Sequence, residues 1–112
     1  MVVLDTNVVI ERVKNGEIIQ ENVTEVTLAE YPPIIDYDKF YGKVLVIERK
    51  DVLLAIELQR RLRLIGKPKN FADLLIASIC VNRDEELITK DTDFVDIAKV
   101  SNLKVRIVEE NL

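Results

Sequence analysis

Hydrophobic residues along the chain fall into short apolar runs separated by longer stretches with helical spacing. The first run, over residues 1–4, ends at Asp5 and is typical of a strand buried on both faces. The next run, over residues 23–27, is rich in β-branched side chains, which favour strands. In all, the runs predict strands over residues 1–4, 23–27, 43–47, 86–89 and 103–108.

The stretches between the predicted strands have the spacing of helices. The clearest helix covers residues 51–65, where leucines recur at every fourth position and Gly66 marks the end. Residues 71–82 are apolar nearly all round, which predicts a helix buried on most sides. Shorter helices are predicted over residues 6–14, 28–31 and 91–99. Thr6 or Asn7 can cap the first of these.

Strands that alternate with helices predict an α/β layer fold with a mostly parallel sheet. The chain of 112 residues suits a single domain over residues 1–112, without an internal repeat or linker. No apolar run approaches the roughly 20 residues that span a membrane, and no signal peptide precedes the first strand. We therefore expect a cytoplasmic protein that does not enter a membrane.

The chain contains no histidine and a single cysteine, Cys80, which narrows the chemistry. Without histidine, Ser-His-Asp triads, Cys-His pairs and His-ligated zinc are excluded. Cys80 lies in an apolar helical run, where a buried and unreactive thiol is expected. The formal net charge of −4 gives no sign of a broadly basic surface, although local patches matter more than the sum.

Four carboxylates stand where predicted strands give way to helices. Asp5 and Asp91 follow strands, and Glu30 and Asp73 lie in the first turns of predicted helices. Because ligands of open α/β sheets bind beyond the carboxyl ends of the strands, we expect all four to gather at one edge. Clustered carboxylates repel one another unless a cation neutralises them, and Mg²⁺ and Mn²⁺ prefer oxygen ligands. The pattern predicts a metal-dependent phosphodiesterase.

Each of the four also has a purely structural explanation. Asp5 could favour the start of a helix through its negative charge, and Asp91 could be an ordinary N-cap. Asp73 follows Asn70 by three residues, a spacing found in capping boxes, and Glu30 could be a solvated acid. The joint pattern favours a site, because a carboxylate at the start of a buried helix needs a cation or hydrogen-bond donors.

Neighbouring residues extend the candidate site. Asp93 is close enough to Asp91 to act as a further metal ligand, whereas Asp96 is expected to face solvent. Polar groups that could orient a substrate or a metal-bound water, or could serve only as helix caps, belong to Thr6, Asn7 and Thr89. Cations that could contact a phosphate backbone, or could instead form a solvated helix face, are Arg60, Arg61, Arg63, Lys67, Lys69 and Lys90.

The candidate residues occur in four short segments: residues 4–10 (LDTNVVI), 26–30 (VTLAE), 73–77 (DLLIA) and 88–94 (ITKDTDF). In this order the segments resemble motifs of the PIN-domain ribonucleases, especially the small VapC-type toxins of type II toxin–antitoxin pairs. The segments cover the chain nearly end to end. The Thr-x-Asp-x-Asp-Phe element of the last segment is fairly specific, whereas Leu-Asp-Thr-Asn alone is weak.

The resemblance implies a three-layer α/β/α sandwich with a central, mostly parallel sheet. It also implies an endoribonuclease that depends on Mg²⁺ or Mn²⁺, with Asp5, Glu30, Asp73 and Asp91 as catalytic residues. Of these, Asp5, Asp73 and Asp91 would hold the metal, with Asp93 as an auxiliary ligand. The implied partners are an RNA substrate, a small antitoxin that blocks the acidic pocket, and a second copy in a homodimer.

Two departures from the family pattern leave an alternative open. The chain is short between Glu30 and the helix over residues 51–65, and Pro32 and Pro33 replace the continuation of a helix. Because this region commonly supports partner contacts, the alternative is a degenerate domain that binds metal, RNA or protein without turnover. A phosphatase of the haloacid-dehalogenase type is set aside, since it needs an aspartate where this chain has Asn7.

Overall fold

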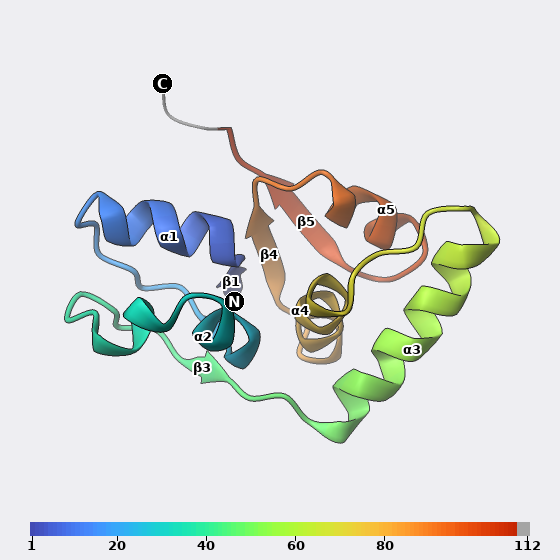
Figure 1. Ribbon diagram of the computed structural model, residues 1–112, viewed down its shortest axis with the longest axis horizontal. Helices are drawn as coiled ribbons and strands as arrows, with labels where there is room; N and C mark the ends of the chain where they lie inside the picture. The colour runs from blue at the N-terminus through green and yellow to red at the C-terminus, as the bar shows by residue number, and fades with distance from the viewer. Residues whose placement is uncertain (110–112) are drawn as a thin grey trace.

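The computed structural model describes residues 1–109, in which strands and helices alternate along the chain (Figure 1). The elements are β1 (Val2–Leu4), α1 (Thr6–Lys14), β2 (Val23–Thr24), α2 (Glu25–Glu30), the 3-10 helix η1 (Pro32–Asp36), β3 (Val44–Leu45), α3 (Arg49–Leu64), α4 (Phe71–Asn82), β4 (Glu86–Thr89), α5 (Asp93–Lys99) and β5 (Lys104–Ile107). None of the helices in this part of the chain is long and apolar enough to cross a bilayer.

The strands form one continuous parallel arrangement. β1, β4 and β5 pair in that order, and β2 pairs with β3. A parallel bridge between Val3 and Asn22 joins the two groups, and the Leu4 N–H donates to the Asn22 carbonyl oxygen at 2.9 Å. The spatial order is therefore β3-β2-β1-β4-β5. Because the order reverses between β1 and β4, their carboxyl ends flank the position where open α/β sheets bind ligands.

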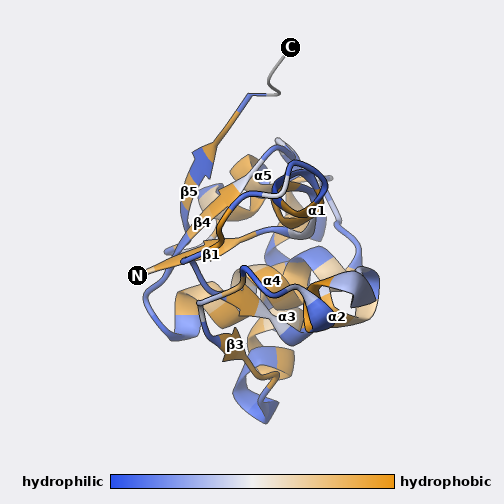
Figure 2. Cartoon of the chain, turned by 90° about the vertical axis from the view of Figure 1, so that its left-hand side faces the viewer, coloured by the Kyte–Doolittle hydropathy of each residue, from blue (hydrophilic) through white to orange (hydrophobic). Residues whose placement is uncertain are grey.

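Alternating side chains of the central strands belong to two hydrophobic cores. Val3 of β1 and Leu87 of β4 pack on one face with residues of α3 and α4. Leu4 and Ile88 pack on the other face with residues of α1. Figure 2 shows α1 on one side of these strands and α3 and α4 on the other. This arrangement confirms the expected three-layer α/β/α sandwich.

The two long helices agree closely with their predictions. α3 covers Arg49–Leu64, and α4 covers the residues expected for the buried helix, with Cys80 fully enclosed. Burial raises the pKa of the Cys80 thiol, which fits the expected unreactive cysteine. Gly66 follows α3 with a φ of +72°, a conformation that favours glycine.

The β-branched segment over residues 23–27 does not form the continuous strand that its composition predicts. β2 covers Val23–Thr24, and α2 begins directly after it. Tertiary contacts favour the helix, because Val26 joins the core formed with α4, and the Thr27 hydroxyl lies 2.8 Å from the Thr6 hydroxyl. Strand propensity is a weaker influence than these contacts.

The third strand is also shorter than predicted, with two residues of the expected 43–47. Side chains from other elements bind the backbone that follows it. The Ile47 N–H donates to Glu25 Oε1 at 2.6 Å, and the Val46 carbonyl oxygen accepts from Arg83 Nη2 at 2.9 Å. These backbone groups therefore have partners outside a strand ladder.

A buried ion pair ties the start of α3 to the end of α4. Asp51 is fully enclosed, and its carboxylate accepts from Arg83 Nη1 at 2.9 Å, from Arg83 Nη2 at 3.0 Å and from Asn82 Nδ2 at 2.9 Å. The Glu48 N–H donates to the same carboxylate at 2.8 Å in a capping box. Burial opposes the charge, but the bonds from Arg83 and Asn82 lower the pKa of Asp51.

Candidate metal centre

The carboxyl ends of β1 and β4 bring acidic residues together. Asp5 directly follows β1, and Asp91 lies two residues beyond β4. The neighbouring helices bring two more acids, since Asp73 occupies the first turn of α4 and Glu30 the last position of α2. Glu30 was expected in the first turn of its helix; it comes at the end because α2 starts earlier in the chain than predicted.

Asp5 is held on both of its carboxylate oxygens. Its side chain is 5% exposed, Oδ1 accepts from the Thr6 N–H at 2.8 Å, and Oδ2 accepts from the Thr89 hydroxyl at 2.7 Å. Asp5 therefore caps α1, rather than Thr6 or Asn7 as expected. Burial raises the pKa of Asp5, and the nearby charges of Glu30 and Asp91 act in the same direction.

Asp73, Asp91 and Asp93 form the most compact group of acids. One carboxylate oxygen from each lies within 4.8 Å of the others. Hydrogen bonds from backbone N–H groups orient Asp91 and Asp93, which follow β4. The Thr89 hydroxyl accepts from the Asp91 N–H at 3.0 Å, and Asp91 Oδ1 accepts from the Asp93 N–H at 2.9 Å. Thr89 therefore touches both Asp5 and the loop that carries Asp91.

Asp73 is an acid whose charge the fold disfavours. Burial, the charges of Asp5 and Asp91 and that of Glu30 raise its pKa to about 6, although a bond from Asn70 lowers it. Asn70 caps α4 by accepting the Asp73 N–H at 2.8 Å, and its Nδ2 donates to Asp73 Oδ2 at 3.0 Å. The capping spacing seen in the sequence is real, and it also orients the carboxylate.

Glu30 lies apart from the compact group, on the exposed side of Thr6. The Thr6 hydroxyl donates to Glu30 Oε1 at 2.7 Å and lies 2.8 Å from the Thr27 hydroxyl. The charge of Glu30 nevertheless raises the pKa of Asp73, a member of the compact group, and also the pKa of Asp5. Thr6 thus links the start of α1 to the acid at the end of α2.

The donor set fits a divalent cation of the Mg²⁺ or Mn²⁺ type. All the converging atoms are carboxylate oxygens, which are the ligands that these hard cations prefer. Burial is the main cause of the raised pKa values of Asp5 and Asp73, and the charges of the neighbouring acids add to it. A bound cation would favour the charged form of both carboxylates. Asp5 and Glu30 do not join the 4.8 Å group, so the compact set differs from the four acids expected to be catalytic.

The cations expected to contact substrate differ in how strongly the fold engages them. Arg61 donates to the Val100 carbonyl oxygen at 2.8 Å, and Arg60, which is 77% exposed, lies 3.8 Å from Glu57. Lys67 lies 3.8 Å from Asp96. Arg60 and Lys67 therefore remain accessible to a ligand, whereas Arg61 also serves to join α3 to the end of α5.

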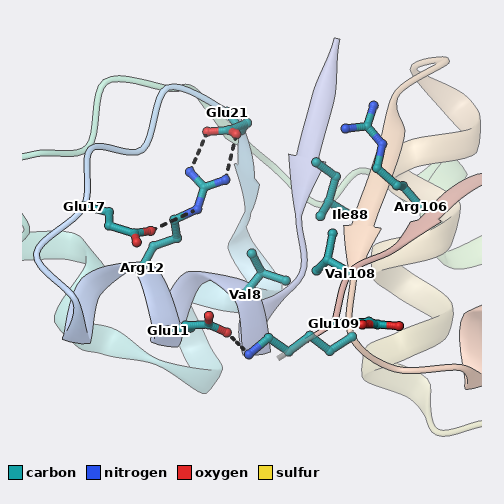
Figure 3. A pocket seen from close by; sticks show the side chains of 10 residues that line it. Val8, Glu11, Arg12, Glu17, Glu21, Ile88, Arg106, Val108 and Glu109 are labelled. Atoms are coloured by element: carbon teal, nitrogen blue, oxygen red, sulfur yellow. Dashed lines mark hydrogen bonds and ion pairs between the residues drawn. The ribbon is translucent and has the colours of Figure 1, made fainter. Parts of the chain in front are cut away.

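Lys90 pairs with Glu11 on the α1 side of the sheet. Both residues line a polar cavity of about 310 Å³ between α1 and the ends of β4 and β5. Figure 3 shows Arg12 of this cavity bonded to Glu17 and Glu21. Five of the charged groups that line the cavity are therefore paired within it, whereas Arg106 pairs with Glu86 outside it. Of the expected polar contacts, Asn7 makes only a long one, since its Oδ1 accepts from the Lys90 N–H at 3.5 Å.

Lys69 was expected as a cation that could contact phosphate, but its contact with the acids was not predicted, and the position of Asp96 was predicted wrongly. Lys69 lies 3.3 Å from Asp93 Oδ1 and 2.9 Å from Asp96 Oδ2, so it enters the acidic group itself. Asp96 was expected to face solvent but is only 16% exposed, because lysines from three positions surround it. These are Lys67, Lys69 and Lys99. The basic loop before Asp73 was a visible signal, but the contact with Asp93 depends on how α5 packs.

The pKa of Asp73 sets a pH dependence for metal binding. A protonated carboxyl group does not serve as a ligand, so we expect Mn²⁺ affinity to fall as the pH drops below about 6. Calorimetric titration of the protein with Mn²⁺ on either side of pH 6 measures this. Equal affinity over that interval would show that Asp73 does not contribute to the binding site.

The geometry agrees with comparisons to known proteins. A sequence model of the PIN domain matches residues 34–100, which include Asp73, Asp91 and Asp93. This bears out the family that the sequence motifs resemble. A comparison with curated proteins finds no significant match.

Solved structures have the same fold at low sequence identity. DNA-bound VapBC from Salmonella typhimurium matches with a TM-score of 0.77 and 17% identity, over 96% of this chain and 98% of that chain. VapBC-5 from Mycobacterium tuberculosis, of the VapBC family of toxin–antitoxin systems, matches with a TM-score of 0.75 and 22% identity over the same shares. VapBC2 from Rickettsia felis, bound to a promoter DNA fragment, matches at 0.73 and 18%, again over 96% and 98%.

Proposed function

Since the chain belongs to the PIN-domain family, we propose that it is an endoribonuclease that hydrolyses RNA phosphodiester bonds with the help of Mg²⁺ or Mn²⁺. The observation that carries this proposal is the convergence of Asp73, Asp91 and Asp93, with carboxylate oxygens within 4.8 Å of one another. An all-oxygen acidic centre without histidine has few other roles in hydrolysis.

The residues of the centre divide into ligands and groups that position them. Asp73, Asp91 and Asp93 would hold the ion, and Asp5 would join them directly or through water. Thr89 would fix the position of Asp5 relative to the loop that carries Asp91, because its hydroxyl is hydrogen-bonded to both. A divalent ion in this position supplies Lewis acidity, which activates a water and stabilises charge on a phosphate.

Two further positions complete the reaction site. Glu30 is exposed and accepts a hydrogen bond from Thr6, and in this proposal it would orient the attacking water from the α2 side. Arg60 and Lys67, which remain accessible, would contact the RNA backbone and position it without reading its sequence. Thr6 and Asn7 would contribute polar contacts at the start of α1.

The biological role proposed is that of the toxin of a type II toxin–antitoxin pair. Support comes from solved VapBC structures of the same fold, of which VapBC-5 belongs to the VapBC family of toxin–antitoxin systems. A small antitoxin protein is the partner that this role requires, and an RNA substrate implies action in the cytoplasm.

A homodimer is also proposed, and the surface between α3 and α4 is a suitable place for it. Ile56 and Phe71 are each 55% exposed there, beside an apolar cavity of about 320 Å³. Exposed apolar side chains grouped around a cavity are typical of protein interfaces.

The test is cleavage of a mixed panel of labelled RNAs by the purified protein, with Mn²⁺ or Mg²⁺ and with EDTA. We expect cleavage with either ion, none in EDTA, and recovery when excess Mn²⁺ is added back. A folded protein that binds Mn²⁺ by calorimetry but cleaves no RNA would instead favour the second candidate, a domain that binds without turnover. Cleavage that persists in EDTA would overturn the metal-dependent mechanism.

A further inference from the structure

We propose that Lys69 is the cation of the site. Its ammonium group competes with the metal ion for the Asp93 carboxylate and neutralises the phosphate that the ion binds. This rests on the function proposed above and assigns a role to a residue outside the carboxylates. The observation behind it is the short distance between the Lys69 ammonium and Asp93 Oδ1, 3.3 Å, at the edge of the compact acidic group.

Contacts to both the side chain and the backbone of Lys69 fix its position. Its side chain is only 11% exposed, and Nζ also lies 2.9 Å from Asp96 Oδ2. The Gln59 side chain clamps its backbone from both sides, because the Lys69 N–H donates to Gln59 Oε1 at 3.0 Å and Gln59 Nε2 donates to the Lys69 carbonyl oxygen at 2.6 Å. A long side chain held at both ends loses little further freedom on binding a ligand.

Lys69 also lies between three elements of the fold. Gln59 belongs to α3, Asp93 and Asp96 belong to α5, and Asp73 follows Lys69 by four residues at the start of α4. Lys69 therefore contacts the Asp93 carboxylate from the loop that leads to Asp73. It differs in this from the other two lysines near Asp96, which do not touch the compact group.

The charge of Lys69 weakens the binding of the metal ion but strengthens the binding of the phosphate group. A positive charge beside a ligand carboxylate repels a divalent cation and competes with it for Asp93. The same charge attracts the phosphate group of RNA and stabilises the negative charge that builds up during hydrolysis. Removing it should tighten metal binding while slowing cleavage.

The first measurement is Mn²⁺ binding without RNA, for the wild type and Lys69→Met. We expect the Mn²⁺ Kd of Lys69→Met to be lower by about fivefold, because a unit charge near a divalent ion is removed. Lys69→Arg, which keeps the charge, should bind Mn²⁺ like the wild type. The matched control is Lys99→Met, which removes an exposed lysine 3.6 Å from Asp96 but not one that touches Asp93.

The second measurement is the rate of RNA cleavage at saturating Mn²⁺. We expect kcat of Lys69→Met to fall by about tenfold or more, since one cation near the transition state is lost, with recovery in Lys69→Arg. Tighter metal binding with slower cleavage separates this role from a structural one, because a distorted site would lose both.

Several outcomes would overturn the proposal. One is a Mn²⁺ Kd for Lys69→Met equal to or higher than that of the wild type, whether or not the wild type cleaves RNA. If Lys69→Met does not fold, Lys69→Gln removes the same charge and must show the same tightening. Unchanged kcat in a protein that cleaves RNA would remove the phosphate role. Failure of the wild type to cleave any RNA counts against the proposed function, and the metal titration still decides the role of Lys69.

Discussion

Asp73→Asn is expected to lower metal-dependent RNA cleavage by on the order of 100-fold or more, because it removes a charged ligand from the acidic centre. The fold orients Asp73 through Asn70 and the first turn of α4. The Asn side chain keeps the size of Asp and one oxygen that can accept the bond from Asn70, so the loss reports the charge and the second carboxylate oxygen. Mn²⁺ binding should weaken in parallel.

The same substitution is expected to stabilise the metal-free protein. The pKa of Asp73 rises from 3.8 to about 6 in the folded state, so the native protein binds the proton more tightly than the unfolded chain. Its contribution to stability is therefore present at low pH and is lost as the pH rises through about 6. At neutral pH in EDTA, Asp73→Asn should gain on the order of 1 kcal/mol, allowing for partial exposure.

Both effects can be measured on one pair of proteins, with Asp36→Asn as the control. Asp36 is an exposed aspartate at the end of η1, away from the acidic centre, and its substitution should change neither property. Urea unfolding in EDTA on either side of pH 6 gives the stability, and the RNA assay gives the activity. A mutant that cleaves RNA like the wild type would remove Asp73 from the site. A mutant less stable than the wild type at neutral pH would contradict the repulsion argument.

Arg83→Met is expected to lower the free energy of unfolding by about 2–3 kcal/mol, because it leaves the buried Asp51 carboxylate without its charged partner. Asp51 is fully enclosed and takes three of its hydrogen bonds from Asn82 and Arg83. Arg83 also holds the Val46 carbonyl oxygen, so the segment before α3 would loosen with it.

A double-mutant cycle with Asp51→Asn separates the pair from the rest of the network. The double mutant should lose less free energy of unfolding than the two single mutants together, since each single change leaves the other charged group without its main partner. Lys104→Met is the control, because its pair with Asp84 lies in solvent and should matter much less. Urea unfolding measures the stability of the four proteins of the cycle and of the control. A strictly additive cycle would show that the ion pair does not couple the two residues.

Much of the fold could be read from the sequence because local patterns and tertiary packing agree there. The end of the apolar run before Asp5 and the middle of the apolar helix, residues 74–80, are buried in the structure as their composition requires. The segment at residues 23–27 shows the opposite case, where strand propensity lost to the contacts of Val26 and Thr27. Propensity decides only where packing does not oppose it.

The sequence by itself determined the chemistry of the candidate site: acidic oxygens, no histidine, and acids placed after strands whose carboxyl ends must meet at one edge of a parallel sheet. Only the tertiary structure decided which acids converge, because Asp73 and Asp93 come from helices whose relative position depends on packing across the core. It also decided that Lys69 reaches Asp93, a contact made by a loop and a helix 24 residues apart. Contacts between distant segments depend on the geometry of the whole fold, and no local pattern encodes them.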